Sequence, residues 1–348
     1  MKKRTMAAIL LAAAALSVTG CKGNGNDAGI SEKTEENQRA DKKEEASAKL
    51  EQVTVILDYV ANTNHTGLYV AKDKGYYEEA GLDVSIVEPT EGATATLVSV
   101  GKGDFGISYQ EDVTVALASK DPLPIKAVAA VIQHNTSGFA VYEESDIHSP
   151  ADFEGKTYAG WGGPGEEAVL KAVMAKEGAD FSKLSMVISD GSGFAALKDK
   201  ADIMWFYEGW DNIKCKMKGF PIRYMELRQL DDRLDYYTPV IIAGSRVLDE
   251  KPDMVRKFLK ATEAGYRYAV ENPDESAEIL QKYAPDYSIE MLQMSQEYLA
   301  GKYMEDSETW GTMKDSVWDS YTDFLKEYGV IDRKIPAYEC YTNEFLPQ

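Results

Sequence analysis

Short apolar runs with strand character alternate with amphipathic runs of helical character along most of this chain, and this alternation limits the possible folds more than any other feature. Strands are predicted at residues 53–58, 83–87, 105–108, 125–132, 157–159, 185–188, 203–207 and 240–243. Helices are predicted at residues 65–80, 93–101, 112–119, 165–177, 193–198 and 210–217. Strands and helices that alternate after short breaks are typical of βαβ units around parallel sheets. The chain is therefore predicted to be an α/β protein.

The alternation occurs in two series, which predicts two α/β lobes. The apolar run at 240–243 would return the chain to the first lobe, and the residues from 252 to about 328 have helical periodicity. Lobe 1 is predicted to comprise residues 52–140 and 239–348, and lobe 2 residues 141–238. Two lobes joined by two crossings would make a hinged clamshell.

The N-terminus has the features of an export signal. A basic Lys2-Lys3-Arg4 segment precedes an apolar run that is too short to span a bilayer, which needs about 20 residues. Residues 1–20 are predicted to be a lipoprotein signal peptide that ends before Cys21, the predicted lipidation site. An ordinary cleavage site with an incidental cysteine is the alternative. Residues 21–51 are predicted to be a flexible, charged tether, so the domain would be extracytoplasmic and lipid-anchored to the cell membrane.

The composition argues against several classes of partner and cofactor. The formal net charge is −20, which is unfavourable for binding nucleic acid, because that affinity depends on neutralising phosphates. The three histidines are scattered and no CxxC or HExxH motif occurs, so no metal site and no cofactor are predicted. Whether Cys215 pairs with Cys340 cannot be decided from their separation.

Polar and aromatic side chains follow several predicted strands, at the end where α/β sheets bind ligands. Aromatic faces stack on flat heterocycles, and carboxylates such as Asp58 and Glu208 can accept hydrogen bonds from exocyclic amines. Trp161 lies in a glycine-rich turn, where it is hard to explain as a core residue. The predicted ligand-binding residues are Asp58, Tyr59, Asn64, His65, Thr66, Tyr109, Gln110, Trp161, Tyr207, Glu208, Trp210 and Tyr237.

These residues also have structural interpretations. The asparagines and threonines after the first strand could simply build a turn. His65 could be a core or capping histidine, or it could orient Asp58. Trp205 and Phe206, near the end of the strand at 203–207, could belong to the core.

The string Asn62-Thr63-Asn64-His65-Thr66-Gly67 resembles the solute-binding lipoproteins of bacterial ABC importers for thiamine pyrimidine precursors. That superfamily is shared with the fungal pyrimidine-precursor synthase, and the resemblance extends over residues 53–340. It implies a type II periplasmic-binding-protein fold that closes around a formylaminopyrimidine-like or hydroxymethylpyrimidine-like molecule. The chain departs from the family pattern at Tyr59, where tryptophan is usual, and at Ala61, where proline is common. Another heterocycle such as riboflavin therefore stays open.

Two classes of function follow. A binding protein would capture the heterocycle, close by hinge rotation and present it to an ABC permease, and it is expected to be a monomer. An enzyme is the second class, because the resemblance implies that a histidine near the position of His65 is consumed in the fungal synthases. Those enzymes share a cysteine-rich stretch, whereas residues 231–238 contain no cysteine. The binding protein is therefore favoured. A sulfonate or nitrate carrier would need a basic pocket, and no cationic cluster marks these loops.

Overall fold

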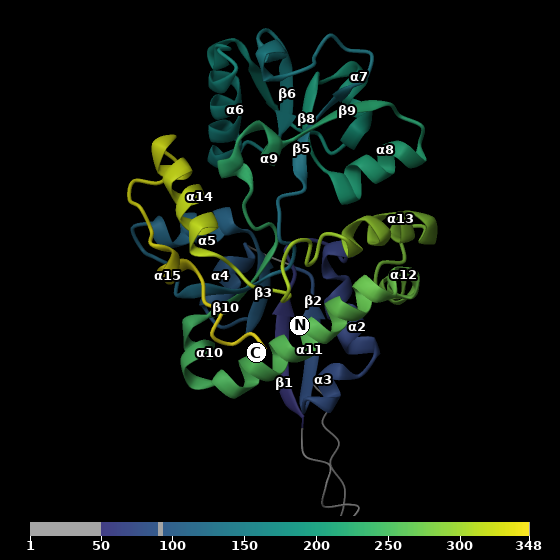
Figure 1. Cartoon of the computed structure of the whole chain (residues 1–348), viewed down its shortest axis with the longest axis vertical. Coiled ribbons are helices and arrows are strands. Elements are labelled where there is room, and N and C mark those ends of the chain that lie inside the picture. The colour runs from purple at the N-terminus through teal and green to yellow at the C-terminus, as the bar shows by residue number, and fades with distance from the viewer. Residues whose placement is uncertain (1–49, 90–92, 348) are drawn as a thin grey trace, which may run out of the picture. The chain divides into compact units, whose positions relative to one another are not determined.

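The computed structural model describes residues 50–89 and 93–347. They form two five-stranded sheets, each flanked by helices (Figure 1). The first sheet has the order β2-β1-β3-β10-β4 and contains β1 Glu51–Ile56, β2 Leu82–Val87, β3 Phe105–Ser108, β4 Ile125–Ala130 and β10 Val240–Gly244. The second sheet has the order β7-β6-β8-β5-β9 and contains β5 Ser137–Tyr142, β6 Thr157–Gly160, β7 Ser185–Ile188, β8 Ile203–Tyr207 and β9 Ile222–Glu226.

The chain crosses between the sheets twice, after β4 and after β9. In the first sheet β1 runs parallel to β2 and β3, whereas the returning strand β10 is antiparallel to β3 and β4. In the second sheet β6 is parallel to β7 and β8, and β5 is antiparallel to β8 and β9. The loops that follow the carboxyl ends of β1, β3 and β8 lie near the two segments that cross between the sheets.

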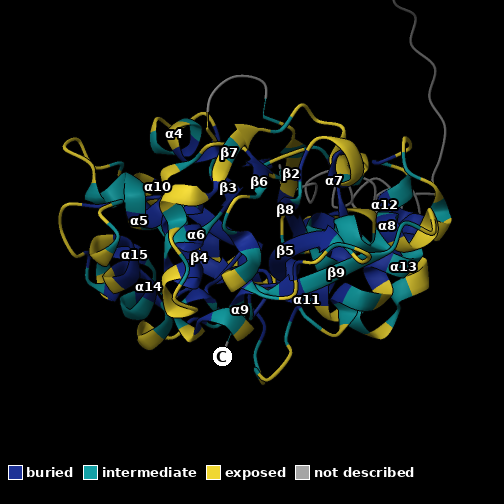
Figure 2. Cartoon of the chain, turned by 90° about the horizontal axis from the view of Figure 1, so that it is seen from above, coloured by how far each residue is buried: buried dark blue, intermediate teal, exposed yellow. Residues whose placement is uncertain are grey.

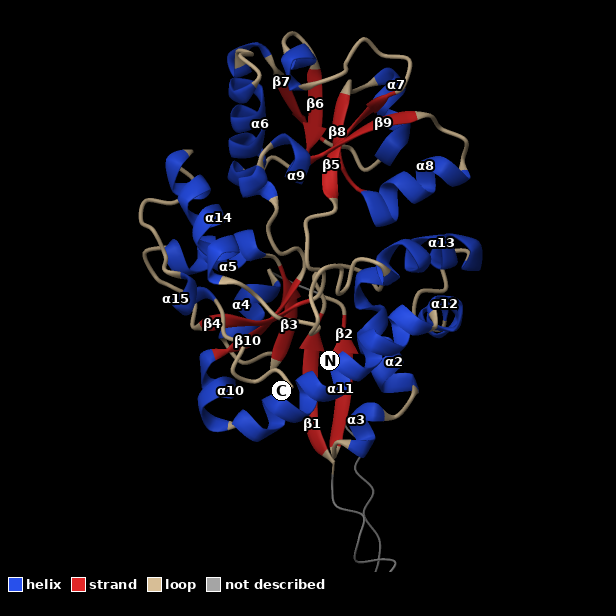
Figure 3. Cartoon of the chain, in the orientation of Figure 1, coloured by secondary structure: helices blue, strands red, loops and turns tan. Residues whose placement is uncertain are grey.

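Helices cover both sheets (Figure 3). Those that follow or precede strands of the first sheet are α2 Thr66–Asp73, α3 Tyr76–Glu79, α4 Thr94–Ser99, α5 Gln110–Ala118 and α10 Ser245–Glu250. Those within the second series are α6 Pro164–Lys176, α7 Ala196–Asp199, α8 Ile213–Met217 and α9 Leu227–Leu230. The C-terminal helices are α11 Pro252–Glu271, α12 Pro273–Gln281, α13 Ile289–Ala300, α14 Asp315–Glu327 and α15 Ala337–Cys340.

The sequence predicted one helix over residues 65–80, and the structure divides it into α2 and α3. Gly75 separates the two with a φ of 78°, a left-handed conformation that glycine adopts without steric penalty. The break lets the chain turn before β2, and α3 still buries Tyr77 against Thr262, with the two hydroxyl oxygens 2.9 Å apart.

Buried residues concentrate in the strands and on the inner faces of the helices (Figure 2). One large cluster lies around the first sheet and α11, where Tyr266 stacks on Trp310 with ring centroids 4.7 Å apart. A second cluster surrounds β5, β6 and β8 and also includes Tyr321 and Phe324 of α14. Helix α14 therefore packs with the core of the second sheet, although its sequence position falls in predicted lobe 1.

Several predicted boundaries differ from the structure or lie outside it. Strand β1 begins at Glu51, the last residue of the predicted tether, and β5 belongs wholly to the second sheet from Ser137 onward. The lobe limits stay predictions. The signal peptide, Cys21 and most of the tether lie outside the described residues. Among residues 50–89 and 93–347, no helix combines the length and the apolar character needed to cross a membrane.

Candidate functional site

A cavity of about 320 Å³ lies between the loops of the two sheets. The loop after β1 and the start of α5 form one wall, the segment after β8 forms the opposite wall, and residues around α13 close one side. The lining residues are Asp58, Tyr59, Asn62, Thr63, Asn64, Tyr109, Thr136, Tyr207, Gly209, Trp210, Asp211, Lys214, Thr238, Tyr287 and Leu299.

The Asp58 side chain lines the cavity and is held by hydrogen bonds from two other side chains. His65 Nε2 lies 2.7 Å from Asp58 Oδ1, and the Tyr109 hydroxyl donates to Oδ2. His65 Nδ1 accepts the Asn62 N–H at 3.2 Å, which leaves the ring proton on Nε2 to donate to Asp58. Burial raises the pKa of Asp58, but the attraction of His65 and the hydrogen bonds from His65 and Tyr109 outweigh it, so the pKa lies below its ordinary value. Asp58 is therefore a fixed carboxylate.

The polar segment after β1 builds its own turn. Asn62 caps the 3-10 helix η1 Thr63–His65, since its side chain accepts the Asn64 N–H at 2.9 Å. The same asparagine donates its backbone N–H to His65, which completes a capping box. The turn interpretation and the ligand interpretation of this segment are thus compatible, because the turn holds His65 against Asp58.

The opposite wall carries two aromatic residues, Tyr207 and Trp210. Trp210 and Tyr287 pack edge to face with ring centroids 4.8 Å apart, and both line the cavity. Trp210 belongs to a π-helical turn, η5 Glu208–Asn212, a rare element that is frequent at functional sites. The Asp211 carboxylate accepts the Tyr207 N–H at 3.1 Å, which anchors this turn to the end of β8.

Helix α13 joins the two walls. The Ser295 hydroxyl donates to the carbonyl of Gly209 and lies 2.6 Å from the hydroxyl of Thr63. The Tyr298 hydroxyl donates to Glu208 Oε2 at 2.7 Å. A side chain at Gly209 would meet the ring of Tyr298 at 3.0 Å, so glycine permits this close packing. The contacts of Ser295 and Tyr298 form a seam, which connects the loop after β1 with the loop after β8 along one edge of the cavity.

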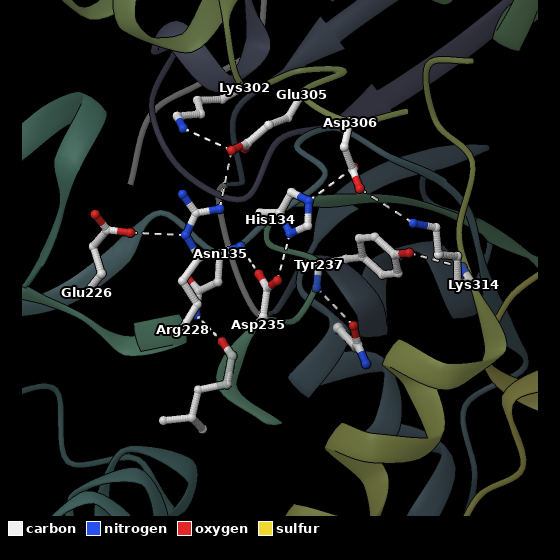
Figure 4. A network of polar contacts seen from close by, with 12 residues as sticks. His134, Asn135, Glu226, Arg228, Asp235, Tyr237, Lys302, Glu305, Asp306 and Lys314 are labelled. Carbon is white, nitrogen blue, oxygen red and sulfur yellow. Dashed lines mark hydrogen bonds and ion pairs between the residues drawn. The ribbon is translucent and has the colours of Figure 1, made fainter. Parts of the chain in front are cut away.

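The two crossings are also bonded to each other (Figure 4). His134, in the first crossing, has Nδ1 2.6 Å from Asp235 Oδ2 in the second crossing and Nε2 3.1 Å from Asp306 Oδ1. Two carboxylates facing both ring nitrogens favour the imidazolium form, and the hydrogen bond with Asp235 raises the pKa of His134 above its ordinary value. Arg228 of α9 adds an ion pair to Glu305 at 3.4 Å. The crossings thus carry a charged network outside the cavity.

Six of the predicted binding residues line the cavity: Asp58, Tyr59, Asn64, Tyr109, Tyr207 and Trp210. Their contact with a ligand stays a prediction. The structure places the other six elsewhere. His65 is fully buried behind Asp58, and the Thr66 hydroxyl donates to the Thr63 carbonyl. Glu208 accepts from Tyr298 in the seam rather than facing the cavity.

Gln110, Tyr237 and Trp161 also lie away from the lining. Gln110 Oε1 accepts the Tyr237 N–H at 2.9 Å, and the Tyr237 hydroxyl accepts the Lys314 N–H at 2.9 Å, so both residues hold the second crossing. Trp161 is 54% exposed and packs edge to face on the buried Trp205, with ring centroids 5.1 Å apart. Trp205 and Phe206 are buried, as their structural interpretation predicted.

The predicted binding residues did not include nine of the lining residues: Asn62, Thr63, Thr136, Gly209, Asp211, Lys214, Thr238, Tyr287 and Leu299. Asp211 and Lys214 carry a local signal, since they follow β8 directly by way of Trp210. Tyr287 and Leu299 carry no such signal, because only the packing of the C-terminal helices brings them to the cavity.

The cysteines Cys215 and Cys340 are buried in separate clusters and unpaired. In the described part of the chain no group of three acidic, histidine or cysteine side chains could hold a metal ion.

The fold and the cavity between its two sheets define a periplasmic-binding-protein fold with the strand order of type II. The periplasmic aliphatic sulphonate binding protein SsuA of Escherichia coli matches this fold with a TM-score of 0.66, over 86% of this chain and 94% of that chain. Their sequence identity is 14%, so the likeness concerns the fold alone. The predicted fold class is confirmed.

Residues 62–276 match the NMT1/THI5-like family, and the chain belongs to that family. The formylaminopyrimidine-binding protein of Halalkalibacterium halodurans is 29% identical over 306 residues, which cover 84% of this chain and 90% of that protein. A 4-amino-5-hydroxymethyl-2-methylpyrimidine phosphate synthase of Legionella pneumophila is 24% identical, with 85% and 92% covered. The riboflavin-binding protein RibY of Chloroflexus aurantiacus is 23% identical, with 87% and 88% covered. The family resemblance is confirmed, and its members include both binding proteins and synthases.

Proposed function

We propose that this protein is an extracytoplasmic solute-binding protein of an ABC importer. Its ligand is a thiamine pyrimidine precursor of the formylaminopyrimidine or hydroxymethylpyrimidine kind, held in the cavity between the sheets. The observation that carries the proposal is the Asp58 carboxylate, which His65 and Tyr109 fix at the cavity wall. A fixed carboxylate accepts hydrogen bonds from the amino group of an aminopyrimidine, while Trp210 and Tyr287 supply ring surfaces for a flat molecule.

The size and charge of the cavity support this ligand class. A volume of about 320 Å³ lies at the small end of the range of about 300–1,000 Å³ for ligand pockets, which suits one ring better than three fused rings. The lining contains two carboxylates, Asp58 and Asp211, and a single ammonium group, Lys214. This balance disfavours an anion such as a sulfonate or nitrate.

The state of His65 supports binding over catalysis. Its side chain is fully buried, and both ring nitrogens are engaged, by Asn62 and by Asp58. A histidine that is consumed as a reactant must reach the substrate, and this one stands behind Asp58. The protein is therefore proposed not to be an enzyme, although synthases are among its relatives.

Riboflavin is the alternative ligand. It is supported by the similarity to RibY and by Tyr59, which is 62% exposed and could extend a stacking surface beyond the cavity.

Delivery to an ABC permease and attachment to the membrane through Cys21 complete the proposal. No cofactor and no nucleic acid take part in it, and the protein would act as a monomer.

The test uses the full chain purified without added ligand. Mass spectrometry of the small molecules released on denaturation should detect an aminopyrimidine. Titration calorimetry should then give tighter binding for formylaminopyrimidine than for riboflavin or methanesulfonate. A preference for methanesulfonate, or binding of none of the three, would contradict the proposal. A preference for riboflavin would replace the pyrimidine by the alternative ligand.

A further inference from the structure

Lys214 is the one cationic side chain among the lining residues that the structure describes. It projects from the short helix α8, which directly follows the π-helical turn of Trp210. The side chain of Lys214 is 32% exposed and borders the cavity. Its position raises the question of what its ammonium group contacts.

Among residues 50–89 and 93–347, no acceptor lies within hydrogen-bonding distance of the Lys214 ammonium group. The Asp211 Oδ1 atom lies 4.0 Å from Nζ, which is beyond hydrogen-bonding distance. The group lies 4.6 Å from the ring centroid of Trp210 and 5.9 Å from that of Tyr287, so both rings face it. Cation–π attraction holds the ammonium group near the rings but leaves its N–H donors without acceptors.

The Asp211 carboxylate lies too far from the Lys214 ammonium group to form a close ion pair with it. Its other oxygen accepts the Tyr207 N–H, which ties the carboxylate to the backbone of the second sheet. Burial lowers the pKa of Lys214 and raises that of Asp211, as expected for two partly buried charges at a distance. A ligand acceptor placed between the rings and Nζ would supply the missing hydrogen bond.

We propose that Lys214 selects among heterocycles by donating a hydrogen bond to a carbonyl oxygen of the ligand and by repelling ligands with a positive charge at that point. This inference rests on the proposed function and adds to it a chemical basis for discrimination. Asp58 and Lys214 then recognise different features of one molecule: the carboxylate an amino group, and the ammonium group a carbonyl oxygen.

Formylation changes a ligand in the way that Lys214 would detect. In a pyrimidine that carries an aminomethyl substituent, the alkyl amine is protonated near neutral pH, whereas its N-formyl derivative is a neutral amide with a carbonyl oxygen. The site should therefore prefer formylaminopyrimidine to the same aminopyrimidine without its formyl group. The gain of one hydrogen bond to a charged donor and the loss of like-charge repulsion together predict a preference of about tenfold or more.

The experiment titrates both pyrimidines into the wild type and into Lys214→Met, Lys214→Arg and Lys216→Met by calorimetry. Lys216 is the matched control, because it lies two residues away on the same helix and is exposed. In Lys214→Met the preference for the formylated ligand should fall to about threefold or less, while affinity for the unformylated amine stays equal or rises. Lys214→Arg should retain the sign of the preference, and Lys216→Met should match the wild type.

Equal weakening of both ligands in Lys214→Met, or an unchanged preference, would overturn the inference while leaving the proposed function intact. A wild type that binds neither pyrimidine would contradict the proposed function instead. The same four proteins would then be titrated with riboflavin, a neutral heterocycle with carbonyl oxygens. Lys214→Met should weaken riboflavin binding about tenfold, and equal binding by both proteins, or no binding at all, would refute the role of Lys214.

Discussion

At the scale of single residues, the arrangement around Asp58 explains why a polar segment follows an apolar strand. Each carboxylate oxygen accepts one hydrogen bond from the protein, from His65 or from Tyr109. A carboxylate offers about four acceptor positions, so capacity remains for a ligand amine. Its low pKa keeps the group ionised throughout the neutral range.

Asp58→Asn tests this role. The substitution keeps the shape but removes the charge, so affinity for an aminopyrimidine should fall by about tenfold to a hundredfold in titration calorimetry. Asp199→Asn, at an exposed site on α7, is the control and should bind as the wild type does. Unchanged affinity in Asp58→Asn would remove the residue from the binding site.

Trp161 offers a second prediction, because the structure gives it an unusual setting. The carboxylate of the fully buried Glu166 accepts the N–H groups of Trp161 and Gly162 at 3.2 and 2.7 Å, so the loop is fixed although the indole is exposed. Trp161 lies outside the cavity lining, so it can contact a ligand only if hinge closure moves its loop toward the cavity. If closure does so, Trp161→Ala should weaken ligand binding while lowering the melting temperature by less than about 3 °C, because little buried surface is lost. Comparable losses in both would assign the indole to packing against Trp205.

At the scale of elements, the strands were the most predictable part of the fold. Apolar runs such as 203–207 and 240–243 match β8 and β10, because a buried strand needs an uninterrupted apolar stretch. The break between α2 and α3 was missed, since helical periodicity continues across Gly75. The wall after β8 was predicted through Tyr207 and Trp210, but Tyr287 was not, because it reaches the cavity through the packing of distant helices.

The crossings provide a prediction about pH. The raised pKa of His134 means that its contacts with Asp235 and Asp306 stabilise the fold fully below the unfolded-state pKa of about 6.5. This contribution is lost as the pH rises through the raised folded-state pKa. The free energy of unfolding from denaturant titration should therefore fall over that interval, and His134→Gln should remove the fall.

His148 is the control for this measurement, because it is exposed and has no carboxylate partner within ion-pair distance in the described residues. His148→Gln should keep the wild-type pH dependence. A pH profile that is the same in His134→Gln and in the wild type would show that the network between the crossings does not respond to His134.

At the level of the whole protein, a binding domain is proposed to follow an export and anchoring signal. If Cys21 is lipidated, the wild type should partition with membranes, because acyl chains supply the apolar surface that inserts. Cys21→Ser should shift the protein to the soluble fraction on ultracentrifugation, with ligand affinity unchanged. Equal partitioning of both proteins would contradict the lipid anchor without affecting the binding site.

The proposed function depends on a flat aminopyrimidine binding between the two sheets. The most direct test is a crystal structure of the protein grown with formylaminopyrimidine. The ring should lie in the cavity, with its amino group within about 3.2 Å of the Asp58 carboxylate and its face or edge against Trp210 and Tyr287. A ligand bound elsewhere, or a cavity filled by the protein's own side chains in the presence of saturating ligand, would contradict it.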